Sequence, residues 1–147
     1  MCDCVVTVPM NFTHPSAPGL RGLDAWAAEG DAAGEPETGQ EWWFTTYGTV
    51  PVFIPGDRLY IVCEDRIRGY APITGVMYDD SRFKSGNAPI AFVRKGGAVA
   101  VTIPQKVVGF RGWRSRWWDR SEEIAFPDWR TADRRNKTAR AMTQPRR

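Results

Sequence analysis

Residues 110–120 interleave four arginines with four aromatic side chains. A guanidinium group binds phosphate through two parallel hydrogen bonds and stacks on flat rings, while aromatic rings stack on bases. The segment therefore predicts a nucleic-acid contact whose phosphate ligands are Arg111, Arg114, Arg116 and Arg120. The alternative is a solvated network in which these arginines pair with Asp119, Glu122, Glu123 and Asp128, and such pairs contribute only about 0–1 kcal/mol each.

The conformation of this segment decides which of its side chains face outward. In a strand, alternation places Trp113 and Trp117 on the core side and Arg114, Arg116 and Trp118 on the outer side. In a helix, the same two tryptophans belong to the buried stripe. Both conformations predict that Trp113 and Trp117 are buried and that the arginines are exposed.

The charge of the chain is uneven along its length. Residues 1–110 hold 9 basic and 12 acidic side chains, whereas residues 111–147 hold 11 basic and 5 acidic ones. The basic side chains after residue 110 are almost all arginine, and they include Arg134 and Arg135. A polyanion is the natural partner of such a segment, so we expect nucleic acid, RNA or DNA, as the partner.

Short β-prone runs separated by turn residues predict the elements that position these side chains. One short helix is expected over residues 23–29, with Gly30 as its stop. Gly96-Gly97 predicts a tight hairpin between two strands, because primed turns need positive φ angles. The small, polar and acidic segment 30–40 predicts a mobile loop. Strands are expected over residues 5–8, 42–47, 59–63, 66–76, 90–94 and 98–103, with one or two more within 107–118.

This pattern predicts a mainly β, α+β fold: a small mixed β-barrel or pseudobarrel with one or two short helices. Residues 1–40 are expected to pack a strand, a short helix and the loop on a barrel formed by residues 41–130. From Thr131 onward the chain has almost no apolar side chains. This composition predicts that residues 131–147 form a basic, disordered tail.

Residues 55–76 carry a more specific pattern. The residues Pro55-Gly56-Asp57 are typical of a turn, and the composition of residues 59–63 predicts a buried strand. Glu64-Asp65 is then expected to reverse the chain. Gly69 predicts a bulge in the strand that follows. This arrangement resembles the central hairpin of PUA-like domains, the superfamily that includes the PUA, ASCH and EVE families. The resemblance covers about residues 41–103. The use of Ala, Arg and Trp also resembles that of proteins from actinobacteria and their phages.

The resemblance implies a domain that binds nucleic acid and holds a modified or unpaired base in an aromatic pocket beside the barrel. A flipped base is read by rings on its faces and by hydrogen bonds to its Watson–Crick edge. The ring candidates that the resemblance implies are Trp43, Tyr47, Tyr70, Trp118 and Trp129. For any single one of them, filling the core is the simpler role.

A second hypothesis is a protein-interaction or inhibitory module of phage type, in which exposed Trp and Arg serve as hot spots. A third is a hydrolase acting on modified nucleosides, which would need Lys84 or Lys106 near a carboxylate such as Glu64. The motif of the ASCH-type amidohydrolases, Gly-x-Lys-x-x-Glu-x-Arg, is absent, and so are nucleophile elbows and phosphate-binding glycine loops. We therefore assign no catalytic residue.

Cysteine usage and hydropathy set further expectations. Cys2, Cys4 and Cys63 with His14 could form a four-ligand zinc site, but Cys-x-Cys matches the usual spacing poorly. No metal or cofactor is therefore expected. The longest apolar run is far shorter than the ~20 residues that span a bilayer, and the start of the chain lacks signal-peptide features. We expect a cytoplasmic protein without a membrane partner, in the host cytoplasm if a phage encodes it.

Overall fold

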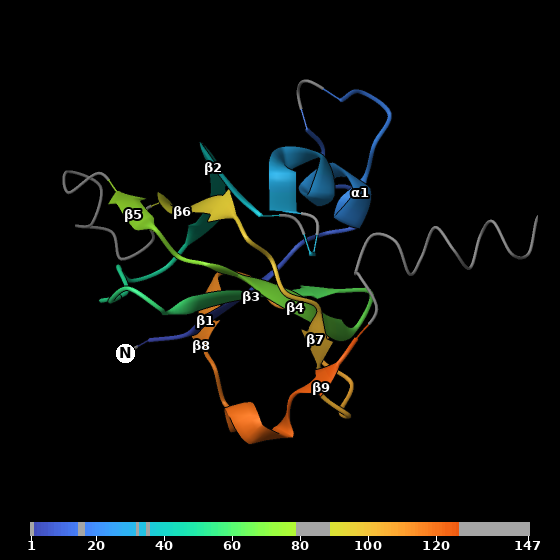
Figure 1. The fold of residues 1–147 in the computed structure, drawn as a ribbon, viewed down its shortest axis with the longest axis vertical. Coiled ribbons are helices and arrows are strands. Elements are labelled where there is room, and N and C mark those ends of the chain that lie inside the picture. The colour runs from blue at the N-terminus through green and yellow to red at the C-terminus, as the bar shows by residue number, and fades with distance from the viewer. Residues whose placement is uncertain (1, 15–16, 32, 35, 79–88, 127–147) are drawn as a thin grey trace, which may run out of the picture.

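The computed structural model describes residues 2–14, 17–31, 33–34, 36–78 and 89–126. It shows a small α+β fold made mostly of strands, with a single short α-helix. Figure 1 shows a main sheet across the middle of the molecule, a second sheet and the helix on one side of it, and two short strands on the other. The expected fold class is therefore confirmed at this level.

The main sheet has the order β4-β3-β1-β8. It comprises β1 (Cys4–Thr7), β3 (Arg58–Cys63), β4 (Arg66–Pro72) and β8 (Trp113–Ser115). Strand β1 lies parallel to β3 and antiparallel to β8, and its first three residues are fully buried. The β-branched and apolar run of β3 is buried on both faces, as its composition predicted.

The hairpin between β3 and β4 confirms two predictions. Glu64 and Asp65 have φ angles of 53° and 62°, which is the left-handed conformation that a two-residue primed turn requires. Ile61 pairs with Gly69 and Val62 with Ile67, so β4 carries an extra residue between them. Gly69 has a φ of 147° next to this bulge, in agreement with its predicted place.

The second sheet has the order β2-β6-β5, with β2 (Glu37–Tyr47), β5 (Gly75–Tyr78) and β6 (Pro89–Gly96). Strand β2 begins at Glu37, so the expected loop over residues 30–40 was too long. The predicted Gly96-Gly97 hairpin was wrong, because β6 pairs with β2 and β5. The positive φ angles of the two glycines instead let the chain leave the second sheet and run beside β4, where Val99 bridges Tyr70.

Beyond this crossing, the predicted strand over residues 98–103 is reduced to β7 (Val101–Thr102), which pairs with β9 (Ile124–Ala125). A short 3-10 helix, η3 (Arg120–Glu122), precedes β9 and is capped by Asp119. The described strands form open sheets. The closed barrel expected from the number of strands is therefore not formed by the described residues.

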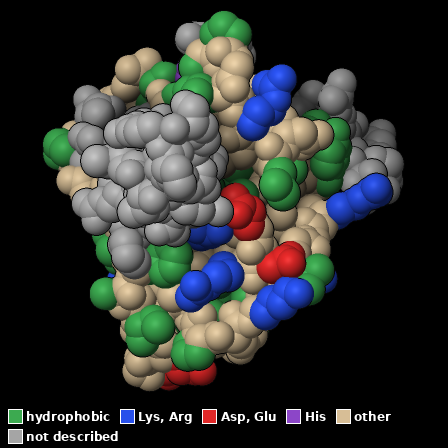
Figure 2. Space-filling view, turned by 90° about the vertical axis from the view of Figure 1, so that its right-hand side faces the viewer, with side chains coloured by type: hydrophobic (Ala, Val, Ile, Leu, Met, Phe, Trp, Pro, Cys, Tyr) green, Lys and Arg blue, Asp and Glu red, His purple; other side chains and the backbone are tan. Residues whose placement is uncertain are grey.

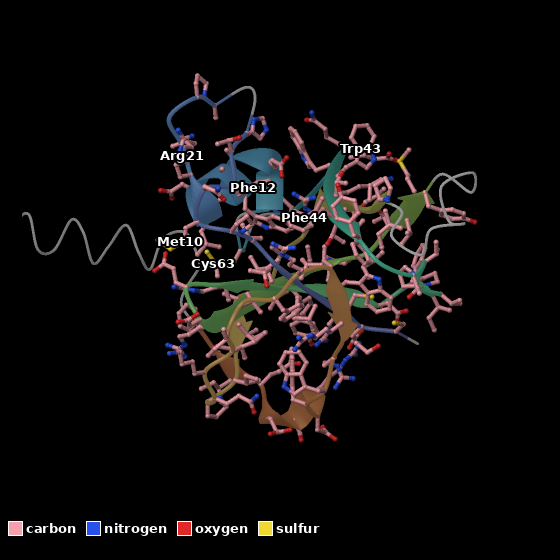
Figure 3. All side chains as sticks on the ribbon, turned by 180° about the vertical axis from the view of Figure 1, so that it is seen from behind. Met10, Phe12, Arg21, Trp43, Phe44 and Cys63 are labelled. Atoms are coloured by element: carbon pink, nitrogen blue, oxygen red, sulfur yellow. The ribbon has the colours of Figure 1, made fainter. Side chains whose placement is uncertain are left out.

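The helical segment covers one face of the second sheet. Helix α1 (Gly22–Trp26) continues directly into a π-helical turn, η1 (Ala27–Asp31), so the helix does not stop at Gly30 as expected. Trp26 packs edge-on against Phe44, with ring centroids 5.4 Å apart, and Phe12 contacts both rings. In Figure 3, Phe44 and Phe12 lie close together, whereas Trp43 lies farther from the helix.

The core has two parts. One contains the side chains between the helical segment, the second sheet and one face of the main sheet, including Trp26, Phe44 and Phe92. The other lies on the opposite face of the main sheet and includes Tyr60, Ile103 and Trp118. No helix within the described part of the chain has both the length and the apolar character needed to cross a bilayer.

Candidate nucleic-acid interface

A pocket of about 540 Å³ opens beside the second sheet, and we call it the edge pocket. It is lined by Thr7 and Pro9 at the end of β1, by residues 44–47 of β2, and by residues 110–112 in the loop before β8. Strand β2 is an edge strand among the described sheets, and consecutive residues of it line the pocket. The pocket therefore runs along the edge of β2.

The loop before β8 is attached to both other walls of the pocket. The Phe110 backbone N–H donates to Thr7 Oγ1 at 3.0 Å, and Trp113 Nε1 donates to the Thr49 carbonyl oxygen at 2.7 Å. Gly112 has a φ of 71°, and a Cβ added there would lie only 2.8 Å from the Tyr47 carbonyl oxygen. Only glycine permits this approach without displacing the strand.

The described lining of the edge pocket combines one cation, aromatic rings and hydroxyl groups. Arg111 supplies the charge, and the described residues that line the pocket include no carboxylate. The accessible rings are those of Tyr47 and Phe110, because Phe44 is 6% exposed and packs against Trp26 and Phe12. The hydroxyl groups belong to Thr7, Thr45, Thr46 and Tyr47. This composition suits a flat, polar ligand that carries a negative charge.

Arg111 and Arg114 are the two predicted phosphate ligands that remain exposed. No described carboxylate forms an ion pair with either of them. The Arg114 guanidinium lies over the Phe110 ring, 4.2 Å from its centroid. Phe110 in turn contacts Trp117, whose ring is 44% exposed. Arg111, Phe110, Arg114 and Trp117 thus form a continuous arginine and aromatic surface beside the pocket.

Arg116 and Arg120 are held by an acidic residue instead, in an arrangement we call the Asp3 clamp. Arg116 Nε donates to Asp3 Oδ2 at 2.8 Å, and Arg120 donates to both carboxylate oxygens at 2.9 Å. Burial alone would raise the pKa of Asp3, but the hydrogen bonds from Arg116 and Arg120 outweigh it and hold the pKa below its usual value. The single negative charge of Asp3 therefore offsets one of the two positive charges, and the carboxylate holds both guanidinium groups in place.

The ion pairs that the structure shows for Arg116 and Arg120 are made with Asp3 and not with the nearby acidic residues, of which Asp128 lies outside the described residues. Asp3 lies more than a hundred residues away, and β1–β8 pairing brings it beside Arg116, whose backbone N–H donates to the Asp3 carbonyl oxygen. Glu123 instead accepts hydrogen bonds from Arg58, Tyr60 and Trp118. Burial and the Glu123 carboxylate raise the pKa of Tyr60, so its phenol remains a donor. No sequence signal singles out Asp3.

Two of the predicted ring candidates lie away from the edge pocket. Trp118 is 4% exposed and packs edge-on against Tyr60, so the prediction that it faces outward while Trp117 is buried was wrong. The reason is that β8 ends at Ser115, and the strand alternation does not continue to residue 118. Tyr70 is half-buried beneath the Arg58 guanidinium, 4.0 Å from its ring centroid.

The other two described ring candidates lie on β2. Trp43 and Tyr47 are each about half exposed, at 52% and 53%. They share one face of the strand, while Phe44 and Thr46 on the other face are buried. Tyr47 lines the edge pocket and Trp43 does not. The remaining predicted residues, Trp129, Arg134 and Arg135, and the tail of residues 131–147 lie outside the described residues.

The charged side chains are dispersed on the face shown in Figure 2, where described basic and acidic groups lie beside each other. Lys106 Nζ lies 3.6 Å from Asp65 Oδ2, and both side chains are solvated. This is an ordinary surface pair beside Glu64, and Lys84 lies outside the described residues. Within the described segments, no group of three or more His, Cys, Asp or Glu side chains is placed to hold a metal ion.

No protein-family model, curated protein or solved structure matches this chain. The functional conclusion therefore depends on the chemistry of the site.

Proposed function

We propose that this chain binds single-stranded nucleic acid, with an unpaired or modified base in the edge pocket and the adjoining phosphates on Arg111 and Arg114. The observation that carries the proposal is the lining of the pocket, whose described residues include an arginine and the accessible rings of Tyr47 and Phe110 but no carboxylate. Aromatic stacking of a base contributes about 1–3 kcal/mol, and arginine adds a bidentate phosphate ligand.

The edge position of β2 supports a base as the occupant. An edge strand presents backbone N–H and C=O groups that no neighbouring strand uses. Such groups, together with the hydroxyl groups of Thr45 and Thr46, supply donors and acceptors for the Watson–Crick edge of a base. A PUA-like relationship of the fold is part of the same proposal, and the β3–β4 hairpin with its bulge supports it.

Binding of oligonucleotides by wild type and Arg111→Ala tests the proposal. We expect wild type to bind fluorescent single-stranded RNA or DNA with an affinity that falls steeply as salt rises. Arg111→Ala should weaken binding and reduce the slope of log K against log salt by about one, because one phosphate contact is lost. Tyr47→Ala should weaken binding by about 1–3 kcal/mol while leaving the slope unchanged.

Arg21→Ala is the matched control, because Arg21 is an exposed arginine beside helix α1 (Figure 3) and is not among the residues that line the edge pocket. Its affinity and salt slope should stay close to those of wild type. If wild type does not bind RNA or DNA even at low salt, the proposal is wrong. Equal losses in Arg21→Ala and Arg111→Ala would show that charge alone governs binding and that the pocket plays no part.

A protein partner is the second candidate function, and the outer face of the second sheet favours it. Trp43 on β2 and Met77 on β5 are both about half exposed on this face. Exposed tryptophan is a frequent hot spot of protein interfaces. Binding through this face would be insensitive to salt and would be lost in Trp43→Ala, whereas Arg111→Ala would leave it unchanged.

A further inference from the structure

Two cysteine side chains lie next to each other at the start of β1. The Sγ atoms of Cys2 and Cys4 are 3.7 Å apart, and both cysteines are free thiols. Residues i and i+2 of an extended chain point to the same face, which explains why the two sulfur atoms meet. Cys2 is half-buried and Cys4 is fully buried in the core.

The residue between these cysteines is Asp3, the acceptor of the Asp3 clamp. Its backbone oxygen and carboxylate together accept hydrogen bonds from Arg58, Arg116 and Arg120. A bend in the backbone of residues 2–4 would therefore move the carboxylate that holds Arg116 and Arg120.

A disulfide between Cys2 and Cys4 would require such a change. The sulfur atoms would have to approach from 3.7 Å to about 2.05 Å. An extended chain separates the Cα atoms of residues i and i+2 by nearly 7 Å, the upper limit for a disulfide. The two residues would have to draw together, and the chain would bend at Asp3.

We propose that Cys2 and Cys4 form a redox-sensitive pair whose oxidation to a disulfide loosens the Asp3 clamp and exposes the guanidinium groups of Arg116 and Arg120. The oxidant is a peroxide. This proposal concerns the clamp itself and does not depend on what the edge pocket binds.

The chemistry balances with one hydrogen peroxide for each disulfide. The Cys2 sulfur, the more accessible of the two, attacks a peroxide oxygen; the O–O bond breaks, water leaves and a sulfenic acid forms. The Cys4 sulfur then attacks the Cys2 sulfur, its proton leaves with the displaced hydroxyl group as a second water, and the S–S bond forms. The two sulfur atoms together lose two electrons to the peroxide. Burial and the neighbouring Cys2 raise the pKa of Cys4, which is consistent with Cys2 reacting first.

The test uses the full chain, reduced and then treated with hydrogen peroxide. Peptide mass spectrometry without reduction should find residues 2 and 4 linked, with the loss of two hydrogen atoms. Labelling with phenylglyoxal, which modifies accessible arginines, should then rise several-fold at Arg116 and Arg120 toward the level found in reduced Asp3→Asn. Labelling of Arg111 and Arg114 should not change, because they lie outside the clamp.

Two variants separate the pair from other oxidation. Cys63→Ser should behave as wild type, whereas Cys4→Ser should stop at the Cys2 sulfenic acid without a gain in arginine labelling. Reduction with dithiothreitol should restore wild-type labelling. The proposal is overturned if wild-type Cys2 advances to sulfinic acid without a Cys2–Cys4 link. It is also overturned if the link forms while labelling of Arg116 and Arg120 stays at the reduced level.

Discussion

Asp3 is the carboxylate that holds Arg116 and Arg120 of the arginine-rich segment. It accepts hydrogen bonds from two guanidinium groups and two backbone N–H groups while its side chain is 1% exposed. A buried carboxylate is tolerated only when it is paired in this way. The same contacts that stabilise β1 against β8 hold the guanidinium groups of Arg116 and Arg120, two of the four arginines predicted to bind phosphate.

Asp3→Asn should lower the free energy of unfolding by about 1–3 kcal/mol at neutral pH, because charged hydrogen bonds to two arginines are weakened. The Asp3 pKa is lower in the folded state than in the unfolded state. Its contribution to stability is therefore fully present above the unfolded pKa of about 3.9 and is lost as the pH falls through the lower folded pKa.

Urea denaturation at a series of pH values measures this effect. The difference between wild type and Asp3→Asn should shrink as the pH falls below about 4. Glu41→Gln, at an exposed position of β2, is the control and should stay within about 0.5 kcal/mol of wild type. A difference that is constant from pH 7 to pH 2 would contradict an ionised Asp3 in the clamp.

At the scale of elements, the edge pocket depends on how closely the loop before β8 approaches β2. Gly48 and Gly112 make this approach possible at its two sides. The Trp113 indole lies 3.1 Å from the place of a Gly48 Cβ, and the Tyr47 carbonyl oxygen lies 2.8 Å from that of a Gly112 Cβ. The sequence around Gly112 suggested only a continuous strand or helix, because a close approach of distant backbone leaves no local pattern.

Gly112→Ala should lower the free energy of unfolding by about 1–3 kcal/mol and weaken ligand binding in the edge pocket, since both the positive φ and the short contact oppose a Cβ. Gly56→Ala is the matched control, because Gly56 also has a positive φ, of 96°, but no heavy atom lies within 4 Å of its Cβ position. Gly56→Ala should be destabilised by the backbone strain alone, and its ligand binding in the edge pocket should match that of wild type. If the two variants had equal stability and bound ligand equally well, the short contact between residue 112 and the Tyr47 carbonyl oxygen would have no role in forming the pocket.

At the scale of the whole molecule, a buried ion pair joins the helical segment to the second sheet. Arg94 on β6 is fully buried, lies over the Trp26 ring at 3.8 Å and donates to Glu29 of η1 at 2.5 Å. Burial raises the pKa of Glu29, although the Arg94 charge acts against this shift. The pair fixes the helical segment over the sheet that carries the edge pocket.

Arg94→Met should lower the free energy of unfolding by about 3–5 kcal/mol at neutral pH, because Glu29 is left buried without its partner. Denaturant melts of both single variants and of Glu29→Gln/Arg94→Met measure the coupling. The double variant should be more stable than Arg94→Met, and the deficit of Arg94→Met should shrink as the pH falls, because protonated Glu29 carries no charge. If the loss of unfolding free energy in the double variant equalled the sum of the losses in the two single variants, Glu29 and Arg94 would not be coupled.

Local properties of the sequence determined much of the secondary structure. The β-branched run of β3, the turn at Glu64-Asp65 and the bulge next to Gly69 depend on propensities and allowed φ angles, and these act over a few residues. The same local reasoning placed β1 and the aromatic strand β2 in the right region.

Only the tertiary structure decided which of the charged and aromatic side chains are accessible. Arg114 and Arg116 are alike in sequence, yet one lies exposed over Phe110 and the other is held by Asp3. Trp117 and Trp118 exchange their expected places because β8 ends early. Gly96-Gly97 leaves one sheet for another instead of closing a hairpin. Each of these outcomes depends on contacts between residues far apart in the chain, which form only when the sheets assemble. The secondary-structure propensity of a residue carries no information about such contacts.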